Sequence, residues 1–303
     1  MKKYFNSFYL SLMRFTATYR ASIKTLLRAP LLWLLLLFAL AMVIFKLSQV
    51  HHGYLQQLED GTFGEMIYDN DPRYVLSYET YVGLFYNLNP MVMRYIVPLF
   101  CAISTMILLV RNHDDKVFEI EKSLNVGAGN YILGRLAAIV TINILVGLFL
   151  SSTYVCGYYF TRGGVPELDL LEYFADFSAR LIRIFCNCIV PGILFYITFT
   201  LLAGTLVRNG IVGGIIGIVM AISYYLISTY WMRMPTILVE YINPSPQKLF
   251  NYWGFCGTDL FDNPYMEHLK FTESEMLAFL VTIFALSALM VIATYYSTKR
   301  RKN

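Results

Sequence analysis

The chain has 303 residues, of which 57% are hydrophobic and only 15% are charged. This balance excludes an ordinary soluble globular domain and indicates a membrane protein. The formal net charge is +4, and the basic residues stand beside apolar stretches and not in a patch interleaved with exposed aromatics, which argues against a nucleic-acid partner.

Apolar stretches of membrane-spanning length occur six times along the chain. A hydrocarbon core about 30 Å thick needs roughly 20 apolar residues for one helical crossing. The predicted fold is therefore an all-α polytopic membrane protein, a single transmembrane domain over residues 1–303 with six transmembrane helices. The predicted spans are 30–50, 92–110, 136–158, 184–206, 211–231 and 276–297.

Residues 1–29 precede the first span and carry two stripes at helical spacing. We interpret them as an amphipathic helix in the cytoplasmic interface, with its cations among lipid headgroups; a flexible or targeting tail is the alternative. Pro30 suits the first position of the helix that follows. The apolar stripe contains Phe5, Tyr9, Leu12, Tyr19, Ile23 and Leu26, and the polar stripe contains Ser7, Ser11, Arg14, Thr18, Thr25 and Arg28.

The segment 51–91 follows the first span and is predicted to be an outer loop, because it contains several turn signals. His51, His52, Glu59 and Asp60 offer side chains that can bind metals. Adjacent histidines without a second pair of Cys or His at ligand spacing are, however, typical of surface residues. We therefore predict no metal site.

A charged stretch, 111–135, lies between the second and third spans and reads RNHDDKVFEIEKSLNVGAGNYILGR. Charges of both signs alternate there with apolar residues, which favours a helix at the membrane surface. The alternative is an ordinary solvated loop, since mixed-sign helical patterns are common on protein surfaces.

The distribution of basic residues predicts the orientation of the chain. With the N-terminus inside, the segments 1–29, 111–135, 207–210 and 298–303 are cytoplasmic and hold 15 of the 24 Lys and Arg residues. The rest of the chain holds 16 of the 20 carboxylates. Because basic residues near span ends resist translocation, both termini are predicted to be cytoplasmic.

The third, fourth and fifth spans contain small and polar residues. Asn143, Asn187, Pro191 and Thr198 are candidates for lining a translocation path, with a kink at Pro191; close helix packing is the alternative for each of them. No Asp, Glu, Lys or Arg stands near the middle of a predicted span, which argues against a proton- or sodium-coupled carrier.

Two further outer segments are predicted, 159–183 and 232–275. The second is too long for a turn and too interrupted for a span, and it contains Pro235, Pro244 and Pro246, so short re-entrant helices are expected there. The five cysteines are an odd number and mostly fall in spans, which argues against a disulfide framework.

Sequence motifs for chemistry are absent. The chain contains no G-x-x-x-x-G-K-[ST] loop for ATP phosphates, no G-x-S-x-G and no H-E-x-x-H. We therefore expect no catalytic residues, no cofactor on this chain and no enzymatic activity of its own.

The whole arrangement resembles the permease subunits of type-2 ABC exporters, the ABC-2 family. In that family an acidic helical stretch between spans two and three is followed by a turn, an aromatic, aliphatics and a Gly-Lys or Gly-Arg. The outer YINPSP turn before the last span is also similar to the family pattern. The matching residues in the loop are Glu119, Glu121, Ser123, Leu124, Gly127, Tyr131, Ile132, Leu133, Gly134 and Arg135.

The resemblance implies that 111–135 is a coupling helix on a separate ABC ATPase subunit, which binds ATP and Mg²⁺. It implies a second permease copy or a paralogue, a bacterial plasma membrane, and an amphipathic or hydrophobic cargo such as a peptide, lipid or drug. A non-transporting scaffold or sensor whose outer loops bind a ligand is the alternative, and a secondary carrier with an inverted repeat is a third possibility. The residues expected to couple to the ATPase are Asp114, Asp115, Glu119, Glu121, Ser123, Leu124, Tyr131 and Arg135.

Overall fold

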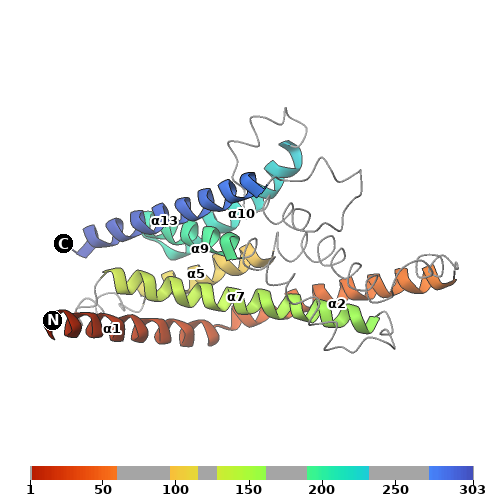
Figure 1. Ribbon diagram of the computed structural model, residues 1–303, viewed down its shortest axis with the longest axis horizontal. Helices are drawn as coiled ribbons and strands as arrows, with labels where there is room; N and C mark the ends of the chain where they lie inside the picture. Colours follow the sequence, from red (N-terminus) through yellow and green to blue (C-terminus); the bar gives the residue numbers. More distant parts are fainter. Residues whose placement is uncertain (1, 60–95, 115–127, 162–189, 232–272, 303) are drawn as a thin grey trace.

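The computed structural model describes residues 2–59, 96–114, 128–161, 190–231 and 273–302. Within these residues it contains helices and no strands, which confirms the all-α class (Figure 1). The helices are α1 (Lys2–Leu27), α2 (Pro30–Glu59), α5 (Val97–Asp114), α7 (Ala128–Thr161), α9 (Val190–Val207), α10 (Gly210–Trp231) and α13 (Glu273–Lys302).

Four of these helices are long and apolar enough to cross a membrane, namely those containing Pro30–Gly53, Gly129–Phe160, Val190–Val207 and Leu280–Thr298. The described parts of α5 and α10 form shorter apolar helices, Val97–Leu109 and Gly210–Met220. The chain is therefore a membrane-embedded helical protein. Each of the six predicted spans overlaps one of these apolar helices, and four of the six helices are long enough to be candidate spans, while residues 92–95 and 184–189 of two predicted spans lie outside the described residues.

Several helices extend beyond their predicted spans, and α2 and α7 do so the furthest. α2 continues past residue 50 to Glu59, and α7 begins at Ala128, well before residue 136. An α-helix satisfies its own backbone hydrogen bonds, so it need not end where the hydrocarbon core ends. Part of the outer loop expected from residue 51, and the end of the charged stretch before residue 136, are consequently helical.

Two prolines stand near the first described residues of their helices. Pro30 is the first residue of α2, as predicted. Pro191 is the second described residue of α9, directly after residues that lie outside the described part of the chain. The kink expected at Pro191 therefore stays a prediction.

α7 is the central element of the bundle. α1 packs along its first half and α2 packs along its second half, while α5, α9, α10 and α13 pack among themselves on another side (Figure 1). From α2 onward the described helices alternate in direction (Figure 1). Both chain ends, the end of α5, the start of α7 and the α9–α10 turn therefore lie at one end of the bundle.

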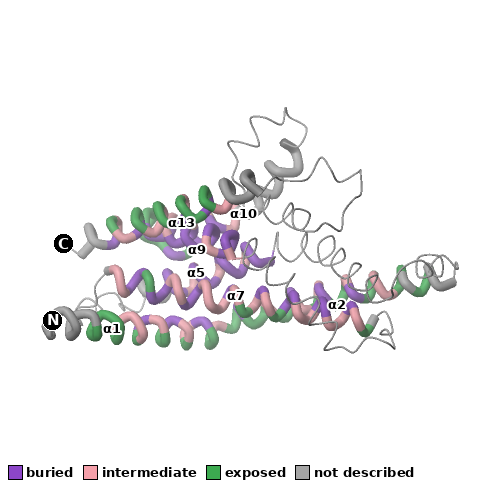
Figure 2. Tube along the Cα trace, in the orientation of Figure 1, coloured by how far each residue is buried: buried purple, intermediate pink, exposed green. Residues whose placement is uncertain are grey.

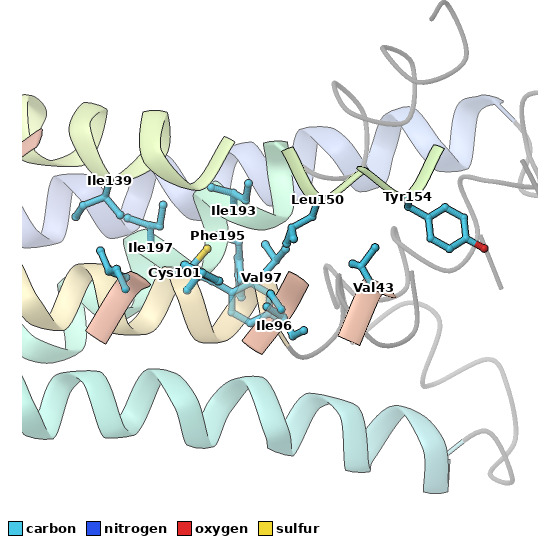
Figure 3. Close-up of a cluster of buried hydrophobic side chains, with 14 of the residues drawn as sticks. Val43, Ile96, Val97, Cys101, Ile139, Leu150, Tyr154, Ile193, Phe195 and Ile197 are labelled. Atoms are coloured by element: carbon cyan, nitrogen blue, oxygen red, sulfur yellow. The ribbon is translucent and has the colours of Figure 1, made fainter. Parts of the chain in front are cut away.

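The core is built from the inner faces of α2, α5, α7 and α9 (Figure 3). Val43, Val97, Leu150 and Ile193 are all fully or nearly fully buried there. The outer faces of α2 and α13 are exposed along their length (Figure 2) and carry large apolar residues such as Leu34, which is 65% exposed. In a membrane such faces contact lipid.

α9 and α10 meet at glycines. A Cβ placed on Gly213 would collide with the backbone of Gly204, so this approach requires a glycine at position 213. The turn between the helices contains Arg208 with a φ of 59° and Asn209, whose Oδ1 accepts hydrogen bonds from the backbone N–H groups of Ile211 (3.0 Å) and Val212 (3.2 Å). Asn209 thus caps the N-terminus of α10.

α1 is helical as predicted, but its faces are used differently. Thr18 and Ser22, on the side expected to be polar and outward, are buried. A Cβ on Gly134 of α7 would lie 3.0 Å from the Thr18 Cβ and 3.2 Å from the Phe15 carbonyl oxygen. Small hydroxyl residues let two helices approach closely, and this is why the hydroxyl stripe packs against α7.

Candidate functional site at the start of α7

The stretch 111–135, which was expected to be one coupling helix, belongs to two helices where it is described. Residues 111–114 end α5 and residues 128–135 begin α7. Tyr131 and Arg135 lie in the first turns of α7, and Asp114 is the last residue of α5. The other expected coupling residues, Asp115, Glu119, Glu121, Ser123 and Leu124, lie outside the described residues.

Arg135 is a buried cation, with 6% of its surface exposed. Its guanidinium carbon lies 3.9 Å from the centroid of the Tyr131 ring, one helical turn earlier on the same face of α7. Its Nη1 donates a hydrogen bond of 3.3 Å to the carbonyl oxygen of Leu108 in α5. Arg135 therefore ties together the two helices that flank residues 115–127.

Apolar side chains from four helices surround this pair. Tyr131 and Ile132 of α7 form a buried cluster with Leu109 of α5 and Leu201 of α9, and Tyr295 of α13 packs against it. The first turns of α7 are thus in contact with α5, α9 and α13. A displacement of the start of α7 would have to move these helices or break the cluster, because packed cores do not deform continuously.

α1 holds the start of α7 from another side. Ser11 Oγ donates a hydrogen bond of 3.0 Å to Asn130 Oδ1, and Tyr19 Oη lies 3.3 Å from Thr141 Oγ1. Together with the close approach at Gly134, these contacts fix α1 to α7 over several turns. The sequence contained signals for this contact, namely the hydroxyl stripe of α1 and Gly134, but they were assigned to an interfacial helix and to the expected coupling helix.

The expected path-lining residues lie inside the bundle where they are described. Asn143 and Thr198 are each 1% exposed and Pro191 is buried, whereas Asn187 lies outside the described residues. A path between two copies of the chain would be lined by residues on the bundle surface, so these positions favour packing within one chain. Thr198 Oγ1 donates to the carbonyl oxygen of Leu194 at 2.8 Å, a common arrangement inside helices.

Asn143 connects α7 to α5 through a buried polar pair. Its Nδ2 donates to Ser104 Oγ at 3.0 Å and to the carbonyl oxygen of Ile139 at 2.8 Å. Ser104 Oγ in turn donates to the carbonyl oxygen of Phe100 at 2.6 Å. Ser104 was missed in the sequence because a serine in an apolar helix carries no signal of its partner.

Metal ligands do not gather anywhere in the described part of the chain. There, no three His, Cys, Asp or Glu side chains are placed to hold one ion. The rings of His51 and His52 near the end of α2 are 6.4 Å apart and tilted. Asp60 lies outside the described residues.

Fold and site together define a helical membrane protein in which the end of a charged segment, at the start of α7, is packed into the bundle. Comparisons of the chain with protein-family models, with curated proteins and with solved structures each find no match.

Proposed function

We propose that the chain is the permease subunit of an ATP-driven exporter of the ABC-2 type. In this proposal it has six membrane spans, both termini are cytoplasmic, and it lies in the plasma membrane of a bacterium. The observation that carries the proposal is the placement of residues 111–135, whose described ends lie at the same end of the bundle as both chain termini (Figure 1).

Positive charge supports this end as the cytoplasmic one. Among the described segments, the start of α1, the first turns of α7, the α9–α10 turn and the last turn of α13 all contain Lys or Arg and lie at this end (Figure 1). Basic residues at span ends are retained inside the cell. The charged segment is then available to a cytoplasmic partner.

Force would enter at this segment and pass through the start of α7. A separate ATPase subunit binds ATP and Mg²⁺ and pushes on residues 115–127. The contact of Arg135 with Tyr131 and Leu108, and the apolar cluster around it, carry the displacement to α5, α9 and α13. A second copy or a paralogue completes the exporter, and the cargo is amphipathic or hydrophobic.

The test is to express the chain with ATPase subunits encoded beside its gene and to purify it. We expect an ATPase to co-purify and to hydrolyse ATP faster in the complex than alone. The double variant E119K/E121K should abolish that acceleration and the efflux of a lipophilic dye. The matched control is E273K/E275K, which reverses two acidic residues at the same spacing in the first turn of α13.

Two results would contradict the proposal. The first is a chain that purifies without an ATPase whichever neighbouring subunit is supplied. The second is a co-purifying ATPase whose rate is the same with the native chain and with E119K/E121K. Either result favours a scaffold or sensor, because such a protein has no need to transmit force through this segment.

A further inference from the structure

The face of α1 that points away from α7 carries a line of cations. Arg20, Lys24 and Arg28 are all exposed and follow one another at intervals of four residues. The backbone N–H of Arg28 donates to the carbonyl oxygen of Lys24 at 3.3 Å, so the helical spacing holds as far as Arg28. Thr18 and Ser22, which alternate with these cations in the sequence, are buried on the opposite side.

The described helices offer these cations no opposite charge. α1 contains no Asp or Glu, and neither does α7, against which α1 packs. In the described part of the chain, acidic residues occur only at the ends of other helices. They are Glu59, Asp114, Glu273 and Glu275.

Such a line of like charges does not stabilise α1 by itself. Cations four residues apart on a helix repel one another and weaken it. Attraction to the helix dipole favours cations in the last turn, which accounts for Lys24 and Arg28 but not for Arg20, two turns from the end. A partner with negative charges at the same spacing would turn this repulsion into attraction.

The direction of the line indicates what kind of partner fits it. α1 runs lengthwise along α7, because Ser11 contacts Asn130 and Tyr19 contacts Thr141 (Figure 1). A helix rises 1.5 Å per residue, so the three cations cover about 12 Å along α7, which contains a candidate span. The headgroup region of one leaflet is only about 5–8 Å thick. A second helix lying alongside α1 can meet the whole line, whereas one layer of headgroups cannot.

Small side chains beside the cations leave room for such a helix. Ala17 and Ala21 are exposed on the same face of α1. Small residues at a helix surface let the backbone of another helix approach closely. The carboxylates of the second helix would then lie within reach of the cations.

We propose that this face of α1 is the docking surface for an acidic helix of another protein chain. Asp or Glu side chains of that helix, at intervals of four residues, pair with Arg20, Lys24 and Arg28. The docked helix acts on the start of α7 through α1, whose other face contacts α7 at Ser11 and Thr18. The proposal rests on the packing of α1 along α7 and is independent of ATP-driven transport.

The test uses the purified full-length chain in a neutral detergent and a fluorescent, alanine-rich peptide with three glutamates four residues apart. A peptide of about 20 residues is long enough to form a helix. Each exposed ion pair contributes about two- to three-fold in affinity, so R20Q/K24Q/R28Q should weaken binding by about ten- to thirty-fold, measured by fluorescence anisotropy. The charge-reversed R20E/K24E/R28E should instead bind the peptide in which lysines replace the glutamates.

Three controls separate a specific line from general attraction to a basic protein. R20K/R28K keeps the charges and should bind the glutamate peptide like the native chain. K46Q/R208Q removes two cations from α2 and from the α9–α10 turn, away from the line, and should also bind normally. A peptide of the same composition, with its glutamates distributed around the helix, should bind the native chain about four- to nine-fold more weakly.

Several outcomes would overturn the proposal. These are no binding of the glutamate peptide by the native chain, equal binding by the native chain and R20Q/K24Q/R28Q, equal binding of the two glutamate peptides, and no binding of the lysine peptide by R20E/K24E/R28E. If R20Q/K24Q/R28Q loses binding to phosphatidylglycerol vesicles but keeps the peptide, the partner is a membrane surface instead. Circular dichroism checks that each variant is folded, which the exposure of all three side chains leads us to expect.

Discussion

At Gly213 the backbone of α10 meets the backbone of α9 with no side chain between them. A Cβ there would collide with the Gly204 Cα, which cannot move aside as a flexible side chain could. Gly213→Ala should therefore lower the free energy of unfolding by about 1–3 kcal/mol, the usual range for overpacking. Thermal unfolding in detergent measures this loss of stability. Gly53→Ala is the control, because a Cβ at Gly53 would have nothing within 4 Å. Equal midpoints for the two variants would contradict the glycine contact.

Arg135 shows how a buried cation can connect two helices. Lysine keeps the charge but lacks the planar group that stacks on Tyr131 and the fork of donors that reaches Leu108. Arg135→Lys should therefore lower the free energy of unfolding by about 1–2 kcal/mol and the thermal midpoint by about 2–5 °C. Arg208→Lys, at an exposed turn residue, should leave the midpoint unchanged. A midpoint for Arg135→Lys equal to that of the native chain would mean that the guanidinium contacts add nothing.

At the scale of elements, α5 and α7 are joined by the pair of Ser104 and Asn143. Polar pairs between membrane helices couple by about 0.6 kcal/mol on average and seldom exceed 1.7 kcal/mol. A double-mutant cycle with Ser104→Ala and Asn143→Leu should therefore give a coupling energy of this size. The same cycle with Thr198→Ala in place of Ser104→Ala is the control, because Thr198 bonds to Leu194 in its own helix. Equal coupling in both cycles would contradict a specific α5–α7 pair.

The sequence predicted the elements of the molecule far better than their contacts. Apolar stretches near 20 residues, and Pro30 at a helix start, are local signals, so six apolar helices and α1 were found. The face of α1 that packs is determined by the helix against which it packs. The sequence could not show that Thr18 packs against Gly134, or that Asn143 forms a hydrogen bond with Ser104. Such contacts depend on a helix that is distant in the sequence, and no local sequence pattern shows which helix that is.

The membrane topology of the whole chain can be tested by labelling the ends of its helices. α5 ends at Asp114 and α13 at Lys302 at one end of the bundle, while α2 ends at Glu59 and α13 begins at Glu273 toward the other (Figure 1). In a variant without the five native cysteines, single cysteines at these four positions would be treated with a membrane-impermeant maleimide.

Because basic residues hold the termini inside, cysteines at Glu59 and Glu273 should react in intact cells, and those at Asp114 and Lys302 only after permeabilisation. Labelling at Lys302 but not Asp114 in intact cells would require an odd number of crossings between them, which the alternating directions of α7, α9, α10 and α13 do not allow. Labelling of both in intact cells would show that the chain has the opposite orientation, in which a cytoplasmic ATPase could not reach residues 115–127. The accessibility of Asp114 thus decides whether the charged segment can receive force from ATP hydrolysis at all.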